Sequence, residues 1–171
     1  ARAAGRVTYP ANFMLIATKN PCPCGYYGDP DHECTCAMQH LLAYQKRISG
    51  PLLDRIDMVI PVARVAETDL LKPSGTPESP RLRALAEQAR QKQYARNNRK
   101  TNAELPSKNI AERCQLTPEA ITFLNDAAKK LSLSARSYFK VIKVARTIAD
   151  LDDNQSVSTT HIAEALQYRR K

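Results

Sequence analysis

The stretch SARSYFKVIKVARTIADL, residues 134–151, carries the most regular helical pattern in the chain. Its apolar side chains recur every three or four residues, a spacing that places them on one face of an α-helix. We expect that face to be buried by Val141, Ile142, Ala145, Ile148 and Ala149. A helix with one apolar face needs other elements to cover it, so the stretch predicts a bundle around itself.

Helical patterns continue on both sides of this stretch. Thr117, Pro118 and Glu119 open one of them as a helix cap, a first-turn proline and a first-turn acid. Ser158, followed by two threonines, is placed to cap the last helix. The expected helices cover residues 81–97, 109–114, 117–131, 134–151 and the stretch that follows 158. We therefore expect residues 81–171 to form an all-α bundle.

The first third of the chain follows a different pattern. Residues 13–18 and 57–62 are apolar runs with prolines at or near their ends, which is typical of buried strands in a parallel sheet. A helical pattern over 37–48 lies between them. Residues 67–80 are rich in proline, serine and glycine, as linkers are. The predicted fold class is an α/β layer in residues 1–66, then this linker, then the helical bundle.

The chain carries a net charge of +9, and most of the excess lies in its second part. Residues 67–171 hold nineteen Lys and Arg against twelve Asp and Glu. This excess suggests an anionic partner, nucleic acid first, as one interpretation. The other interpretation is a solvated basic surface, which charge alone favours. The densest run is residues 81–100, and its candidate nucleic-acid contacts are Arg90, Lys92, Arg96, Arg99 and Lys100.

Targeting signals are not evident in the sequence. No apolar run approaches the roughly 20 residues that a membrane-spanning helix needs, so we expect no membrane partner. Nothing in the composition points to an oxidising compartment, and we expect a cytoplasmic protein.

Two closely spaced pairs of cysteines occupy the polar loop of residues 20–36. Four thiolates on so short a loop can surround a tetrahedral Zn²⁺, and metal binding would order a loop that has little to bury. A structural zinc is favoured, because four protein ligands leave no open position. Disulfides and free thiols are the alternatives, and His32 or His40 could replace one cysteine. The predicted ligands are Cys22, Cys24, Cys34 and Cys36.

Three further polar residues hold positions that catalytic groups often occupy. Asn20 follows the first predicted strand, at the edge where open α/β sheets bind ligands, although Asn-Pro also forms ordinary turns. Arg136 lies in the first turn of a predicted helix, where the helix dipole disfavours a cation unless an anion is near. An ordinary surface arginine is the alternative. Arg55 precedes the second predicted strand, and its position alone indicates an ordinary solvated residue.

Three stretches together resemble a known family. Residues 13–25, FMLIATKNPCPCG, resemble the segment of AAA+ ATPases that ends in the sensor-1 asparagine, specifically in the magnesium-chelatase-like family with its ComM (YifB) branch. Residues 47–57, RISGPLLDRID, match the stretch of that family that bears the arginine finger. Residues 133–150 match its sensor-2 helix, so the resemblance covers nearly the whole chain.

The resemblance implies a role for each of these residues and ATP with Mg²⁺ as cofactor. Asn20 would orient the attacking water or contact the γ-phosphate. Arg136 would approach the nucleotide of its own subunit from the lid, whereas Arg55 would approach that of the neighbouring subunit. A ring follows, typically of six subunits, in motors that act on DNA during transformation and recombination. Residues 1–66 would end the α/β core, and residues 81–171 would be the lid.

One departure from the family pattern limits what this chain can do alone. It contains no G-x-x-x-x-G-K-[ST] phosphate loop, and no acidic strand end that could hold Mg²⁺ precedes Val7. Both elements would precede residue 1. The N-terminal part that carries them would be a partner of this chain, and we expect the isolated chain not to hydrolyse ATP. Two alternatives stay open: a chelatase motor subunit that drives Mg²⁺ into a porphyrin, and a zinc-stabilised nucleic-acid-binding module without ATPase activity.

Overall fold

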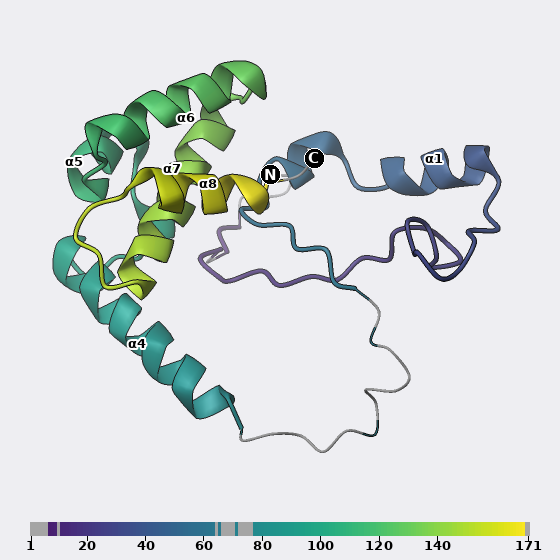
Figure 1. The fold of residues 1–171 in the computed structure, drawn as a ribbon, viewed down its shortest axis with the longest axis horizontal. Coiled ribbons are helices and arrows are strands. Elements are labelled where there is room, and N and C mark those ends of the chain that lie inside the picture. The colour runs from purple at the N-terminus through teal and green to yellow at the C-terminus, as the bar shows by residue number, and fades with distance from the viewer. Residues whose placement is uncertain (1–6, 10, 64, 66–70, 72–76, 170–171) are drawn as a thin grey trace. The chain divides into compact units, whose positions relative to one another are not determined.

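The computed structural model describes residues 7–9, 11–63, 65, 71 and 77–169. The regular elements within these ranges are helices (Figure 1). The chain divides into two compact units, Ala1–Arg47 and Ile48–Lys171. None of the described helices is long and apolar enough to cross a membrane.

The first unit consists of an extended segment, the cysteine loop and helix α1 (Met38–Lys46). Leu41 is the buried residue of α1. The Tyr44 ring of this helix has Lys19 Nζ 5.6 Å and the Arg47 guanidinium carbon 5.9 Å from its centre. The Lys19 contact connects the extended segment to α1, whereas Arg47 directly follows that helix. The helix predicted over residues 37–48 is thus confirmed.

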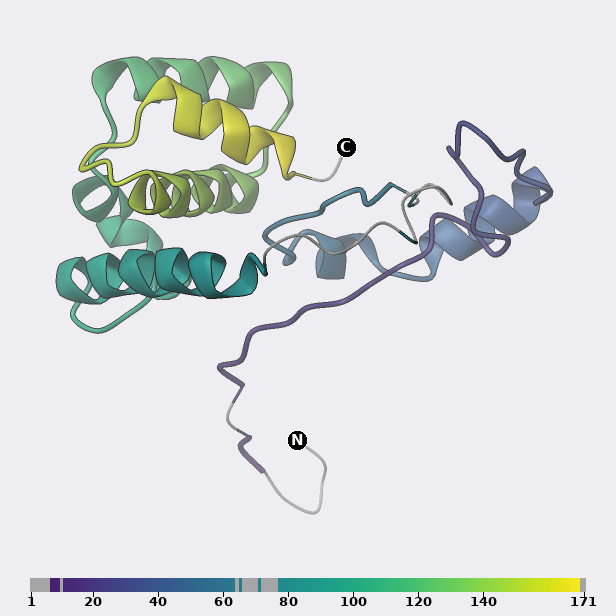
Figure 2. The same cartoon turned by 60° about the horizontal axis from the view of Figure 1, so that its bottom comes forward.

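The second unit is a helical bundle built around helix α7 (Ala135–Leu151). Helix α7 packs against α8, α4, α5 and the 3₁₀ turn η1, and α6 packs against α8. Figure 2 shows α4, α7, α8 and α6 succeeding one another across this unit. The bounds are α2 Gly50–Leu53, α4 Ser79–Arg96, η1 Asn102–Glu104, η2 Ser107–Asn109, α5 Ile110–Cys114, α6 Pro118–Lys130, α7 Ala135–Leu151 and α8 Thr159–Gln167.

The core of the bundle consists of the predicted apolar face of α7 and of the side chains from other helices that cover it. All five side chains expected on that face are buried. Leu124 from α6, Ile162 from α8 and Ile110 from α5 belong to the same cluster. Burying each such aliphatic side chain contributes about 1.5–3 kcal/mol, so packing on α7 holds the bundle together.

The predicted starts of α6 and α8 are capped as expected, and Ser134 also caps α7. Thr117 Oγ1 accepts a hydrogen bond from the N–H of Ala120 at 3.2 Å, and Pro118 is the first residue of α6. Ser134 Oγ accepts from the N–H of Ser137 at 3.2 Å and so begins α7. Ser158 precedes α8 in a capping box. Each cap satisfies N–H groups that a helix start leaves without partners.

The two predicted strands do not form in the part of the chain that the structure describes. Residues 13–18 and 57–62 are extended but belong to no strand, and Ile16 and Val62 are 83% and 89% exposed. The β-type pairing seen in the described ranges is one isolated bridge between Leu116 and Val157. A parallel strand needs neighbours to hydrogen-bond with and helices to cover it, and an apolar run without them stays exposed. The α/β layer is therefore not shown here.

Residues 48–63 contact the helical bundle. The N–H of Val59 donates to the carbonyl of Tyr168 at 2.7 Å. Most of the predicted linker, residues 67–80, lies outside the described ranges, and α4 begins at its end with Ser79.

Candidate functional site

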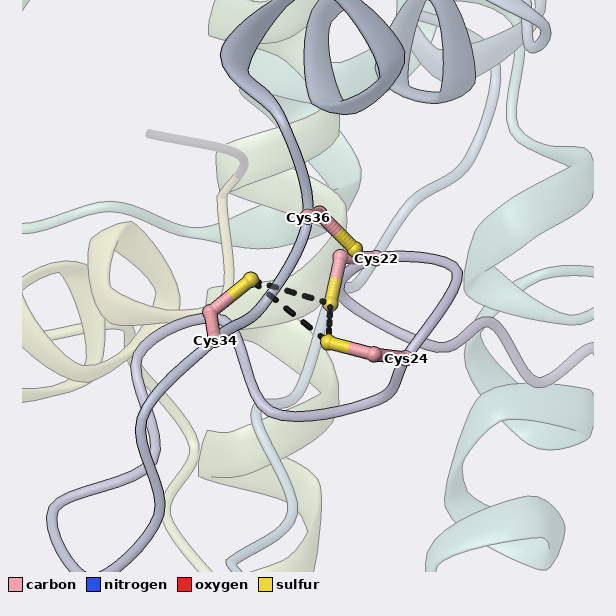
Figure 3. A group of neighbouring side chains, drawn as sticks. All are labelled: Cys22, Cys24, Cys34 and Cys36. Carbon is pink, nitrogen blue, oxygen red and sulfur yellow. Dashed lines mark hydrogen bonds between the residues drawn. The ribbon is translucent and has the colours of Figure 1, made fainter.

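The four loop cysteines converge on one point. Figure 3 shows their side chains turned toward one another from the two ends of the loop. Cys22 Sγ lies 3.2 Å from Cys24 Sγ and 3.7 Å from Cys34 Sγ, and all four sulfurs lie within 4.8 Å of one another. Tetrahedral zinc with Zn–S bonds of about 2.3 Å places its sulfurs about 3.8 Å apart. The cluster therefore fits a zinc ion closely.

Backbone turns, and not an apolar core, shape the cysteine loop. The N–H of Gly25 donates to the Cys22 carbonyl at 3.1 Å, and Gly25 holds a φ of +90°, which favours glycine. The N–H of Tyr27 points to Cys22 Sγ at 3.3 Å. Asp29 Oδ1 accepts two backbone N–H groups at 2.8 and 3.0 Å. These contacts hold the thiols at the positions that a metal needs.

The electrostatics of the cluster favour a cation at its centre. The pKa of the Cys24 thiol is lowered to about 6, first by a backbone hydrogen bond from Tyr26 and then by the Cys22 thiol. The backbone N–H of Cys36 lowers the pKa of Cys34, but burial and the neighbouring thiols outweigh it and raise that pKa to about 12. Adjacent thiolates repel one another, and a dication removes that repulsion.

The alternatives for the loop separate on geometry. The 3.2 Å approach of Cys22 and Cys24 far exceeds the S–S bond length of about 2.05 Å, so the structure holds thiols here. His32 stacks on Tyr26 at 5.0 Å between ring centres, and His40 lines a shallow pocket with Tyr44. Neither histidine belongs to the ligand cluster found among the described residues.

Arg55 lies just after a short helical turn. Ser49 caps α2 by accepting the N–H of Leu52 at 3.3 Å. The Arg55 side chain is exposed, and its Nη1 donates to the carbonyl of Pro51 at 2.7 Å. The guanidinium therefore folds back along its own turn.

Arg136 meets this same turn from the second residue of α7. Its Nη1 lies 3.3 Å from Asp54 Oδ2, and Ser137 Oγ donates to Asp54 Oδ1 at 3.1 Å. One turn further along α7, Lys140 Nζ donates to the carbonyl of Ile56 at 2.7 Å. The anion that the position of Arg136 called for is thus Asp54, a residue that the sequence analysis did not single out.

A pocket of about 190 Å³ lies beside these contacts, between the Arg55 turn and α7. Its walls combine apolar and charged side chains, among them Leu53, Asp54, Lys140, Val141 and Arg169. The residues that form the Asp54 contacts thus lie at the border of a cavity between the Arg55 turn and α7.

Asn20 belongs to the first unit, and the two arginines belong to the second. The Asn20 side chain is exposed and ends the extended segment, two residues before the first cysteine. Any order in the cysteine loop therefore extends directly to the backbone around Asn20.

The candidate nucleic-acid contacts of α4 divide into two groups. Arg96 donates to both oxygens of the buried Asp150 at 2.8 and 2.7 Å. Lys92 Nζ lies 2.7 Å from Asp153 Oδ1 and donates to the Asp150 carbonyl at 2.9 Å. These two cations bind within the bundle, whereas the exposed members of the set are Arg90, Arg99 and Lys100.

Comparison with known families identifies the family of this chain. Residues 1–70 match the family described as magnesium chelatase, subunit ChlI, and residues 76–169 match its C-terminal region. The chain belongs to the magnesium-chelatase ChlI family. The chain is 38% identical over 169 residues to competence protein ComM of Haemophilus influenzae and 37% identical over 171 residues to the Escherichia coli protein YifB. It is also 31% identical over 172 residues to an uncharacterized protein of Mycobacterium bovis.

These alignments cover nearly all of this chain but a minor part of each relative. They include 98% of the chain and 33% of both the Haemophilus and the Escherichia protein. The chain therefore spans about a third of the length of the relatives it matches.

Proposed function

We propose that this chain is the sensor and lid part of a ComM/YifB-like AAA+ ring ATPase that couples ATP hydrolysis to DNA remodelling. The main supporting observation is a contact between two turns of one compact unit. Asp54, next to Arg55, contacts Arg136 and Ser137 in the first turn of α7. Phosphoryl transfer is accelerated by positive groups placed where negative charge develops. Two arginines on neighbouring turns would suit that task.

The contact between Arg136 and Asp54 changes one role that the resemblance implied, which was that Arg136 approaches the nucleotide of its own subunit. Since Asp54 precedes Arg55, the two arginines would approach the same nucleotide. If Arg55 serves the neighbouring subunit's nucleotide, as an arginine finger does, Arg136 would serve it too. Hydrolysis would then require a ring, with six subunits as in the family that the sequence resembles. ATP and Mg²⁺ would be held by a phosphate loop outside this chain.

The cysteine cluster would hold a structural Zn²⁺ in this protein. Its four ligands leave no open position for a substrate. Bound zinc would stiffen the loop that begins just after Asn20, so that this side chain keeps a fixed direction toward the attacking water.

DNA is the substrate favoured by the name of one relative and by charge. The chain is 38% identical to a competence protein, and competence is the uptake of DNA. Exposed Arg90, Arg99 and Lys100 would contact phosphates without breaking internal ion pairs. The family description favours the second candidate, a chelatase motor that drives Mg²⁺ into a porphyrin.

The experiment that tests this proposal is ATP turnover by the complete protein with branched, single-stranded and double-stranded DNA. We expect DNA to stimulate turnover, and rising salt to weaken that stimulation steeply because phosphate contacts release counterions. Replacing Arg90, Arg99 and Lys100 together by Ala should reduce the stimulation, whereas replacing the exposed Arg83 should leave it unchanged. ATP turnover that no DNA alters would contradict the DNA role and favour the chelatase reading.

A further inference from the structure

Asp54 receives two donors from the first turn of α7. Ser137 Oγ donates to one carboxylate oxygen at 3.1 Å, and Arg136 Nη1 lies 3.3 Å from the other. The side chains of Asp54 and Arg136 are 37% and 51% exposed. A carboxylate that binds two adjacent donors at the start of a helix orients that helix start relative to the segment that carries the carboxylate.

This arrangement does little for the stability of the fold. Exposed ion pairs contribute little to folding, because water screens the charges and long side chains lose freedom. The turn is already held to the bundle by Lys140 on the carbonyl of Ile56 and by Val59 on the carbonyl of Tyr168, both at 2.7 Å. The Asp54 contacts therefore matter most for where Arg136 points.

Arg136 keeps hydrogen-bonding capacity while it contacts Asp54. A guanidinium carries five N–H donors, and the pair with Asp54 involves Nη1. The remaining donors suit phosphate oxygens, which guanidinium groups bind well. Arg55 is directed by a different acceptor, the carbonyl of Pro51 at 2.7 Å. Each arginine thus has its own anchor on a single turn.

We propose that Asp54 is the positioning residue that holds Arg136 beside Arg55, so that both guanidiniums reach one nucleotide phosphate together. This inference rests on the proposed ATPase function and assigns no chemistry to Asp54 itself. The carboxylate sets the geometry of a pair of cations, and its negative charge is the property that matters.

The test is steady-state ATP turnover by the complete protein carrying Asp54→Asn. The amide keeps the size of the side chain and an acceptor for Ser137 but loses the charge that holds Arg136. We expect kcat to fall about tenfold or more while the KM for ATP changes less than about threefold, since the loss concerns the transition state. Asp54→Glu should recover part of kcat because it restores the charge.

Coupling with Arg136 separates positioning from a general structural effect. Residues that act through each other are non-additive, so Asp54→Asn combined with Arg136→Ala should be no slower than Arg136→Ala alone. Asp126→Asn, which changes an exposed aspartate on α6, is the matched control and should keep full activity. Thermal unfolding of each variant shows whether the fold is retained.

Two results would overturn the positioning role: normal kcat in Asp54→Asn, or an additive loss in the double variant. Failure of the proposed function is distinguishable, because then Arg55→Ala and Arg136→Ala would themselves leave turnover unchanged.

Discussion

At the scale of single residues, the bundle depends on one buried cluster of charge. Asp150 is 1% exposed and contacts Arg96 and Arg146, the latter through Nε at 3.2 Å. Asn102 donates to the same carboxylate at 2.9 Å. Burial lowers the pKa of Arg146, an effect that the Asp150 carboxylate opposes. The cluster therefore connects α4, η1 and α7 through a single acid.

Removal of that acid should destabilise this chain strongly. Asp150→Ala leaves two arginines without their counter-charge, and breaking such a buried pair typically costs about 3–5 kcal/mol. The free energy of unfolding, measured with urea, checks this value. Asp126→Ala on the exposed face of α6 is the control and should change stability by less than about 0.5 kcal/mol. A loss of similar size in both variants would refute the role of the cluster.

Sequence reasoning could not identify this cluster or the role of Asp54. Arg96 and Asp150 are 54 positions apart, and Arg136 and Asp54 are 82 apart. Local patterns do not report which acid a cation will meet at such separations. Arg96 and Lys92 therefore stood among the nucleic-acid candidates on charge alone, although the fold engages both. A signal for Asp54 was present: an acid directly before a candidate arginine finger.

At the scale of elements, helices were predictable and strands were not. Local periodicity and capping predicted the face of α7, the caps at Thr117 and Ser158, and the approximate bounds of α4. The segments 13–18 and 57–62 needed strands beside them, and periodicity cannot supply a partner. The cysteine cluster was predictable because its ligands lie close together in the chain.

The cysteine loop should contain metal in protein purified without chelators. We expect about one zinc per chain by elemental analysis, and loss of zinc on replacing Cys22 and Cys34 by Ser. Cys114→Ala, which changes the buried cysteine of the bundle, should keep the metal. Zinc-free protein in which all four loop thiols react freely would reject the site.

At the scale of the whole molecule, we propose that the chain supplies groups that respond to a nucleotide held elsewhere. The sequence that contains Asn20, Arg55 and Arg136 has no phosphate-loop motif, and it spans about a third of the length of its relatives. In the proposed ring, the edge formed by Arg55 and Arg136 would face the nucleotide of a neighbour. Turnover would then be a property of the assembly and not of one subunit.

The measurement that tests this account most directly is ATP turnover by the complete protein carrying Arg55→Ala. Nucleotide binding should stay close to normal, and turnover should fall by about 10³ or more, as it does when a finger arginine is missing. Mixing this variant with a subunit that lacks a working phosphate loop should restore part of the activity, because mixed rings contain intact interfaces. Normal turnover in Arg55→Ala, or no recovery on mixing, would contradict the account.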